Sequence, residues 1–173
     1  IAYDSRRKST EFAREAALVL CAAGVKVFLY ESLRPVPVLS FTVRHLKCIA
    51  GIVITASHNP AQYNGYKVYW TDGAQMPPES VKGITDRLPD TTYEESLPMD
   101  EQEALAKGLL TYIGKDVDDA VDAVFETFAK LKFEIYQNSG NPIGHLSTSS
   151  LSVQACNSLA ECLLRLEKSP DGI

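Results

Sequence analysis

The sequence predicts an α/β fold built around a mostly parallel β-sheet. Short apolar segments alternate with amphipathic segments of helical period through about the first 70 residues. The connections between them are short, and strands that alternate with helices in this way pair in parallel through right-handed crossovers. With 173 residues and 45% apolar content, the chain can also bury one sizeable core.

The first strand is expected at residues 1–4, "IAYD", and a polar loop follows it. A helix is expected next, with Ser9 as its N-cap, Glu11 in its first turn and Gly24 at its end. The apolar residues that recur at helical spacing predict its buried face, which comprises Phe12, Ala16, Val19, Leu20 and Ala23.

Two buried strands and a second helix continue the alternation. The apolar segments at 25–31 and 49–55 predict the strands, and a helix is expected between them at about 38–47, after two prolines. The inner stripe of this helix comprises Leu39, Val43 and Leu46. The segment 66–70, "YKVYW", predicts one more strand. Because only a short turn precedes it, this strand either pairs antiparallel with 49–55 or is separated from it by an irregular loop.

The second half of the chain is less regular. A third helix is expected near Pro78, and the acidic, proline-bearing segment at about 89–110 is typical of a surface linker. A clear amphipathic helix is expected at about 116–131. Its apolar stripe comprises Val117, Val121, Val124, Phe128 and Leu131. Three acids near its start, Asp116, Asp118 and Asp119, favour a helix N-terminus over a metal cluster.

The length of the chain favours one domain, and we leave the segment 132–173 unassigned. That last segment contains a possible strand, a loop rich in Gly, Ser and Asn, and a possible final helix. The chain begins with Ile1 rather than Met, so we expect a fragment or a processed form.

The composition narrows the class of protein. A net charge of −5 with scattered Lys and Arg argues against a nucleic-acid-binding face, which needs clustered basic residues. No apolar run is long enough to span a bilayer, and the first residues do not resemble a signal peptide. The four cysteines form no C-x-x-C pair and lie in apolar stretches, which favours reduced thiols. We therefore expect a cytoplasmic protein that binds neither nucleic acid nor membrane.

Polar loops follow the first and third predicted strands, where ligands bind in open α/β sheets. These loops are "DSRRKS" and "TASHNP", and Lys67 lies ten positions beyond Ser57. Ser57 lacks the G-x-S-x-G context of a hydrolase nucleophile, and the adjacent His58 would point to the opposite face of an extended backbone. A phosphoryl carrier needs cations instead, and Arg6 and Lys67 can supply them. The residues therefore favour a phosphate-carrying serine over a hydrolytic one.

The combination of "YDSRRKS", "TASHNP" and "YNGYKVYW" resembles the first domain of the α-D-phosphohexomutase family, above all its phosphoglucomutase and phosphopentomutase branches. The resemblance covers about 1–131 and is firmest over 1–88. It implies a three-layer α/β/α domain with a mixed, mostly parallel sheet. It also implies an intramolecular phosphotransferase that interconverts sugar 1-phosphate and sugar 6-phosphate through a phosphoserine and a bisphosphate intermediate.

The resemblance also implies roles for individual residues. Ser57 would be the phosphoserine, Arg6 would steady its phosphate, and Lys67 would contact the phosphate and assist proton transfer. His58 and Asn59 would bind the phosphate as neighbours in the same loop. The implied cofactors are Mg²⁺, bound to Ser57 through its phosphate, and glucose 1,6-bisphosphate as a primer.

Several family motifs are missing from this chain, among them the metal loop D-G-D-x-D-R and the phosphate loop R-x-S-G-T-E-P. The sequence therefore predicts an incomplete phosphoglucomutase-type chain that carries the catalytic serine. Its expected partners are a phosphosugar substrate and the remaining mutase domains. The alternatives are a phosphopentomutase or phosphomannomutase, a truncated regulatory or binding form without catalysis, and a serine hydrolase.

Overall fold

The computed structural model describes residues 1–60, 62–124 and 126–127. The chain divides into two compact units, 1–125 and 126–173, and the description below concerns the first unit. The predicted stripe residues Phe128 and Leu131, the segment 132–173, and with it Cys156 and Cys162, lie outside the described residues. The predicted domain boundaries stay predictions.

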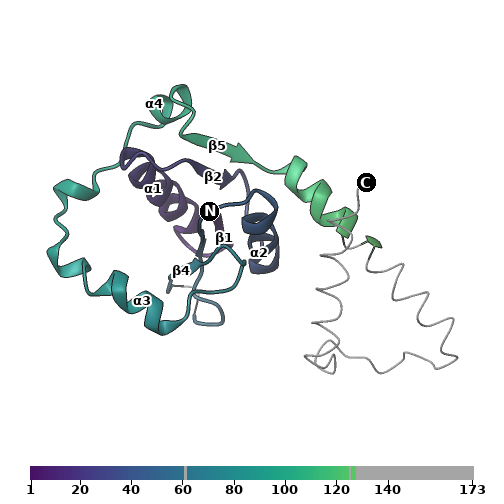
Figure 1. Cartoon of the computed structure of the whole chain (residues 1–173), viewed down its shortest axis with the longest axis horizontal. Coiled ribbons are helices and arrows are strands. Elements are labelled where there is room, and N and C mark those ends of the chain that lie inside the picture. Colours follow the sequence, from purple (N-terminus) through teal and green to yellow (C-terminus); the bar gives the residue numbers. More distant parts are fainter. Residues whose placement is uncertain (61, 125, 128–173) are drawn as a thin grey trace, which may run out of the picture. The chain divides into compact units, whose positions relative to one another are not determined.

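A five-stranded arrangement forms the centre of the first unit (Figure 1). The strands are β1 Ala2–Tyr3, β2 Val27–Tyr30, β3 Gly51–Ile54, β4 Tyr66–Tyr69 and β5 Leu110–Ile113. β1 pairs in parallel with β3, β2 pairs in parallel with β5, and β4 runs antiparallel to β3. The backbone of Ile1 joins the three strands β1, β3 and β4 to the pair β2 and β5. Its nitrogen donates to the Phe28 carbonyl (2.6 Å), and its carbonyl accepts from the Tyr30 N–H (3.1 Å). The order β5-β2-β1-β3-β4 confirms a mixed, mostly parallel sheet, with the antiparallel option realised at β4.

Helices cover both faces of this sheet. The helices that pack on it are α1 Ser9–Ala22, α2 Val36–His45, α4 Glu101–Ala106 and the helical residues 115–124. α3 Pro78–Thr85 and the 3-10 turns at Leu88–Asp90 and Glu94–Ser96 have no buried residue. α1 and α4 pack with the side chains of one face, among them Tyr3, Leu29 and Ile54. α2 and the helix at 115–124 pack with the other face, around Val53 and Tyr30. The three-layer α/β/α architecture is thus confirmed.

The buried face of α1 differs from the predicted one. The helix buries Ser9, Ala13, Ala17, Leu18 and Cys21, whereas Phe12 is 50% exposed. Small alanines on the inner face let the helix axis approach the sheet closely. The predicted residues Phe12, Ala16, Val19 and Leu20 instead line an apolar groove together with Ile54 and Tyr66. Helical period alone could not distinguish these two faces, because both are apolar.

The segment predicted as an acidic linker contains regular structure. Asp100 caps α4 by accepting the Glu103 N–H (3.0 Å), and Ala104 is fully buried against the core. β5 follows and pairs with β2 along its whole length, from Leu110 opposite Val27 to Ile113 opposite Tyr30. The sequence interpretation missed both elements, because α4 is only six residues long and β5 pairs with a strand more than 80 positions earlier in the chain.

Within the part of the chain that the structure describes, no helix is both long and apolar enough to cross a membrane. The two described cysteines, Cys21 and Cys48, are free thiols. The cytoplasmic location stays a prediction.

Gly51 allows α2 to pack closely on β3. A Cβ at this position would lie 2.5 Å from Val43 Cγ2 and 3.3 Å from Leu39 Cδ2, and both of these side chains are 1% exposed. We expect Gly51→Ala to lower the free energy of unfolding by about 1–3 kcal/mol, because a filled core cannot shift to accept a methyl group. Urea denaturation followed by circular dichroism measures the change.

Gly83 offers a matched control inside α3, since a Cβ there would meet no atom within 4 Å. Gly83→Ala is expected to raise the free energy of unfolding by about 0.5–1 kcal/mol through helix propensity. If both substitutions changed stability in the same direction and by the same amount, close packing at Gly51 would not be the cause.

A polar network ties α1, α4 and β5 together at the surface. Glu101 accepts hydrogen bonds from Arg14 Nε (2.6 Å) and from the Tyr112 hydroxyl (2.6 Å). Burial is the largest cause that raises the pKa of Tyr112 to about 12 from the ordinary 10.0. The hydrogen bond to Glu101 and the negative charge of Glu101 raise this pKa further. The folded chain therefore keeps Tyr112 neutral at a pH where the unfolded chain releases the proton.

From this shift we expect the stability that Tyr112 contributes to be present below pH 10 and lost as the pH rises toward 12. The ultraviolet absorbance of the phenolate, recorded as the difference between the wild type and Tyr112→Phe, isolates this titration. Glu101→Gln is expected to move the titration back toward pH 10, because it removes the negative charge. An unmoved titration would contradict the assigned cause.

Candidate functional site

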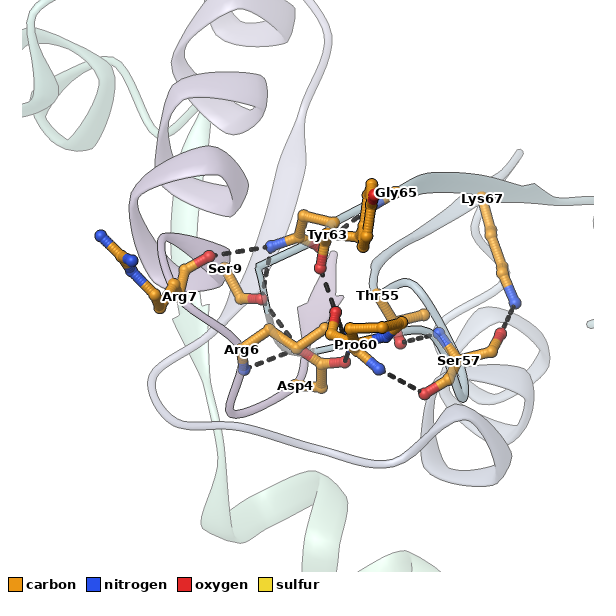
Figure 2. A network of polar contacts seen from close by, with 11 residues as sticks. Asp4, Arg6, Arg7, Ser9, Thr55, Ser57, Pro60, Tyr63, Gly65 and Lys67 are labelled. Atoms are coloured by element: carbon orange, nitrogen blue, oxygen red, sulfur yellow. Dashed lines mark hydrogen bonds and ion pairs between the residues drawn. The ribbon is translucent and has the colours of Figure 1, made fainter.

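The candidate site is formed by two loops at one edge of the sheet (Figure 2). One loop follows β1 and begins at Asp4, and the other connects β3 to β4 over 55–65. Because β1 and β3 are parallel neighbours, their carboxyl ends lie at the same edge. β4 then returns antiparallel to β3 with Lys67 opposite Val53, which brings the lysine side chain back beside the second loop.

Ser57 and Lys67 are in direct contact. Lys67 Nζ donates a hydrogen bond to Ser57 Oγ, and the serine is exposed to solvent. Ser57 lies in a turn that the Asn59 N–H closes onto the Ala56 carbonyl (3.1 Å), and its own N–H donates to Thr55 Oγ1 (3.0 Å). Its φ of 56° is in the left-handed region, which residues with a Cβ rarely adopt. The loop thus holds Ser57 in a backbone conformation that costs free energy.

The strain at Ser57 gives a stability prediction. We expect Ser57→Gly to be more stable than Ser57→Ala by about 0.5–1 kcal/mol, because glycine adopts positive φ without the steric cost that alanine retains. Both substitutions remove the same hydroxyl, so each is the control for the other in thermal and urea denaturation. Equal stability of the two variants would mean that the left-handed turn costs nothing.

Arg6 lies under the second loop. Its Nη2 donates to the Ser57 carbonyl (2.6 Å), and its Nη1 donates to the carbonyls of Pro60 (2.9 Å) and Tyr63 (3.3 Å). The side chain is 12% exposed, and its Nε lies 3.2 Å from the Asp4 carboxylate. Arg6 therefore binds the backbone of the loop, and its direct contact with a phosphate stays a prediction.

The side chains of the remaining predicted site residues make no hydrogen bond with Ser57 or Lys67. His58 and Asn59 are exposed, and among the described residues their side chains have no hydrogen-bond partner. His58 does not bind Ser57, whose hydroxyl is held by Lys67 instead. The Arg7 side chain points away from Ser57 in Figure 2. The roles predicted for His58 and Asn59 stay predictions.

Three polar residues that the sequence interpretation did not assign to the site connect its two loops. Asn64 Nδ2 donates to Ser9 Oγ (2.9 Å), and Ser9 Oγ donates to Asp4 Oδ1 (2.8 Å). The prediction of Ser9 as an N-cap was wrong, because Lys8 occupies that position with φ 66° and the Ser9 hydroxyl is used by Asp4. Of these residues, only Asp4 could have been noticed in the sequence, because it is an acid two positions before Arg6 at the end of a predicted strand.

Gly65 closes the second loop through a close approach of two backbones. Its φ is not positive. A Cβ there would lie 2.7 Å from the Thr55 carbonyl oxygen, so the requirement is for close approach of two backbones where the loop closes. The Gly65 carbonyl accepts from the Thr55 N–H (2.9 Å), and its N–H donates to Asn64 Oδ1 (2.9 Å).

The charge of Asp4 is stabilised in this setting. Burial raises the pKa of its carboxyl group, but the Thr55 hydroxyl, the Arg6 backbone N–H, the Ser9 hydroxyl and the Arg6 charge together outweigh burial. The net result is a pKa below the ordinary value of 3.8. Asp4 is therefore ionised in the folded chain throughout the neutral range.

Chemically, the site offers an exposed hydroxyl that is contacted by one lysine, in a loop whose carbonyls are bound by a partly buried arginine. This arrangement provides positive charge beside a group that can hold a phosphate. It lacks the pairing of serine with an oriented histidine that acyl transfer requires, since His58 makes no contact with Ser57 Oγ. Among the described residues, no three His, Cys, Asp or Glu side chains are grouped to hold a metal ion.

Comparisons with known proteins agree with this geometry. The family model described as "Phosphoglucomutase/phosphomannomutase, alpha/beta/alpha domain I" matches residues 1–95. A phosphopentomutase of Homo sapiens is 47% identical over 94 residues, which are 51% of this chain and 15% of the relative. A phosphoglucomutase of Staphylococcus haemolyticus is 37% identical over 153 residues, which are 88% of this chain and 25% of the relative.

One solved structure is also similar. It is a crystal structure of a Thermus thermophilus protein described as a "putative phosphomannomutase", with a TM-score of 0.53 and 37% identity. The similarity covers 57% of this chain and 22% of that one. The chain thus spans a quarter or less of the length of these three proteins.

Proposed function

Since this chain belongs to the phosphoglucomutase/phosphomannomutase family through its α/β/α domain I, we propose that Ser57 is the phosphoryl carrier of a phosphosugar mutase. The reaction interconverts a sugar 1-phosphate and a sugar 6-phosphate. Ser57 gives its phosphoryl group to the sugar phosphate, and the resulting bisphosphate returns its other phosphoryl group to Ser57. The observation that carries this proposal is the hydrogen bond from Lys67 Nζ to the exposed Ser57 hydroxyl in a family-specific loop.

Lys67 supports transfer in both directions. When the phosphoryl group leaves Ser57, negative charge develops on Oγ, and the ammonium group that already donates to this atom stabilises that charge. When Ser57 carries the phosphate, the same ammonium group balances part of its charge of about −1.5 to −2. Because phosphoryl transfer depends mainly on positioning and charge, one fixed cation has a large effect.

The proposed substrate is glucose phosphate, with glucose 1,6-bisphosphate as the primer. Relatives named phosphoglucomutase and phosphopentomutase both match this domain, so a pentose phosphate is the alternative substrate. The described residues favour neither sugar, because the matched domain carries the phosphoryl group rather than the features that would read the sugar ring. The remaining mutase domains are the proposed partners of this one.

Mg²⁺ is proposed as a cofactor, but the described residues supply only part of its site. The described residues do not fit a magnesium site by themselves, because they bring together no group of three metal-ligating side chains. A phosphate on Ser57 would supply one oxygen, and further ligands would have to come from outside the described residues. No step above is routed through the metal.

The decisive experiment measures phosphate transfer to Ser57. The full chain is incubated with glucose 1,6-bisphosphate and magnesium, and intact-mass and peptide analysis locate any added phosphoryl group. We expect one phosphoryl group on the peptide that contains Ser57 and none on Ser57→Ala. A wild-type chain that never accepts phosphate would overturn the carrier assignment.

The second candidate is a regulatory or binding form without catalysis, since the described residues bring together no group of three metal-ligating side chains. A coupled assay of sugar-phosphate isomerisation distinguishes the two. Phosphate on Ser57 without turnover indicates a carrier domain that needs its partners, whereas turnover by the chain alone excludes the non-catalytic form. Lack of reaction with an acylating serine probe dismisses a hydrolase.

A further inference from the structure

We propose that Asp4 is a positioning residue, which holds both ends of the Ser57 loop through Arg6 and Ser9. The inference about transfer rate rests on the proposed function, but the inference about loop geometry does not. Asp4 lies at the carboxyl end of β1, outside the loop that carries Ser57, and it touches neither Ser57 nor Lys67 through its side chain (Figure 2).

The Asp4 carboxylate orients two different groups. Oδ1 accepts from the Arg6 backbone N–H (3.0 Å) and from the Ser9 hydroxyl (2.8 Å), while Oδ2 faces Arg6 Nε at 3.2 Å. One side chain thus fixes the guanidinium of Arg6 and the direction of the Ser9 hydroxyl. Arg6 and Ser9 belong to the first loop and the start of α1, whereas Thr55, whose hydroxyl also bonds to Asp4, begins the second loop.

Two arms then reach the second loop. The Arg6 arm binds the carbonyls of Ser57, Pro60 and Tyr63. The Ser9 arm binds Asn64, because its hydroxyl proton goes to Asp4 and its lone pairs are free to accept from Asn64 Nδ2. The loop is therefore held at its beginning by one arm and at its end by the other.

The loop needs this external support. Within its described residues, its own backbone hydrogen bonds are two short turns, Asn59 N–H to Ala56 and Tyr63 N–H to Pro60, besides the Thr55–Gly65 pair that closes it. Ser57 nonetheless keeps a left-handed backbone, which persists only when the surroundings determine it. The bonds from Arg6 and Asn64 supply that determination. Asp4 holds Arg6 and the Ser9 hydroxyl, and Asn64 donates to the Arg7 carbonyl (3.2 Å) besides Ser9.

The hydrogen bonds of Asp4 require a carboxylate group at this position. An amide offers one acceptor oxygen, and its NH₂ group would face either the donors of Arg6 or the Ser9 hydroxyl. Asp4→Asn therefore breaks one arm whichever way its amide points. The charge also matters, since an ionised acceptor makes the stronger bond to a guanidinium.

The test compares Asp4→Asn with Asp86→Asn, which removes a similar charge from an exposed pair with Lys82 in the α3 region. Amide hydrogen exchange is measured by nuclear magnetic resonance or mass spectrometry on the full chain, in the loop 57–65 and in β3. We expect exchange in the loop to accelerate at least about 10-fold in Asp4→Asn and to stay unchanged in β3 and in Asp86→Asn.

The same variants are tested in transfer of phosphate from glucose 1,6-bisphosphate to Ser57. The maximal rate is expected to fall about 10- to 100-fold in Asp4→Asn, because the nucleophile is misplaced. The donor concentration that gives half the maximal rate is expected to change less than about 2-fold, because Asp4 does not contact the donor. Unchanged loop exchange, or equal acceleration in β3, overturns the positioning role.

A wild-type chain that accepts no phosphate sinks the proposed function, and the exchange data then still decide the positioning role. If Asp4→Asn does not fold, Ser9→Ala weakens only the Asn64 arm, which then keeps its bond to the Arg7 carbonyl (3.2 Å). It is expected to accelerate exchange at Gly65 while the Ser57 end, held by Arg6, stays protected. Uniform exchange along the loop in Ser9→Ala would contradict the two-arm arrangement.

Discussion

Replacing Lys67 by methionine is expected to lower the rate of phosphate transfer to and from Ser57 by about 100- to 1,000-fold. This is the range found when a single preorganised donor to a developing negative charge is removed. Methionine preserves much of the length and apolar character of the side chain, so the loss reflects the ammonium group. Single-turnover labelling with glucose 1,6-bisphosphate, resolved in time by mass spectrometry, measures both directions.

The matched control is Lys82→Met, which removes a lysine that pairs with Asp86 at the surface. Its transfer rate is expected to equal that of the wild type. Lys67→Arg keeps the charge and tests whether position also matters, since a guanidinium is wider than an ammonium and cannot point at Oγ in the same way. Transfer at the wild-type rate in Lys67→Met would exclude Lys67 from the chemistry.

The order of strands and helices could be predicted because each element has its own local pattern. An apolar run predicts β3, and the helical period of apolar residues predicts α2. Gly51 lies where these two elements pack closely. The buried face of α1 could not be predicted in this way, since its two apolar faces differ only in side-chain size. β5 was missed because its pairing with β2 joins residues more than 80 positions apart, as Val27 and Leu110 show.

The same distinction between local patterns and long-range pairing explains which site residues could be predicted. Ser57 and Lys67 could be predicted as a pair because a short motif fixes their spacing, and the hairpin of β3 and β4 brings them into contact. Asn64 could not, because its partners Ser9 and Arg7 lie far away in the sequence, and Asp4 could not, because an acid in a polar loop has an ordinary explanation as turn chemistry. Their contribution depends on the parallel pairing of β1 with β3, which places the two loops at one edge.

Arg6 gives the second large effect, and here the kind of cation decides the outcome. Its three hydrogen bonds to the loop carbonyls come from a fork that lysine cannot reproduce. We expect Arg6→Lys and Arg6→Met to be similarly impaired, each with transfer to Ser57 slowed about 100-fold and the free energy of unfolding lowered by about 1–3 kcal/mol. Time-resolved labelling and urea denaturation measure the two quantities.

The comparison separates two roles for this arginine. If Arg6 only supplied charge to the phosphate, Arg6→Lys would transfer at nearly the wild-type rate while Arg6→Met failed. If it shapes the loop, both variants lose hydrogen-exchange protection in 57–65, and the retained charge of lysine does not restore the rate. Arg87→Lys, at an exposed arginine whose side chain has no partner among the described residues, is the control and should change neither quantity. Because the Arg6 side chain is 12% exposed and its guanidinium donates to three loop carbonyls, the geometry favours the second outcome.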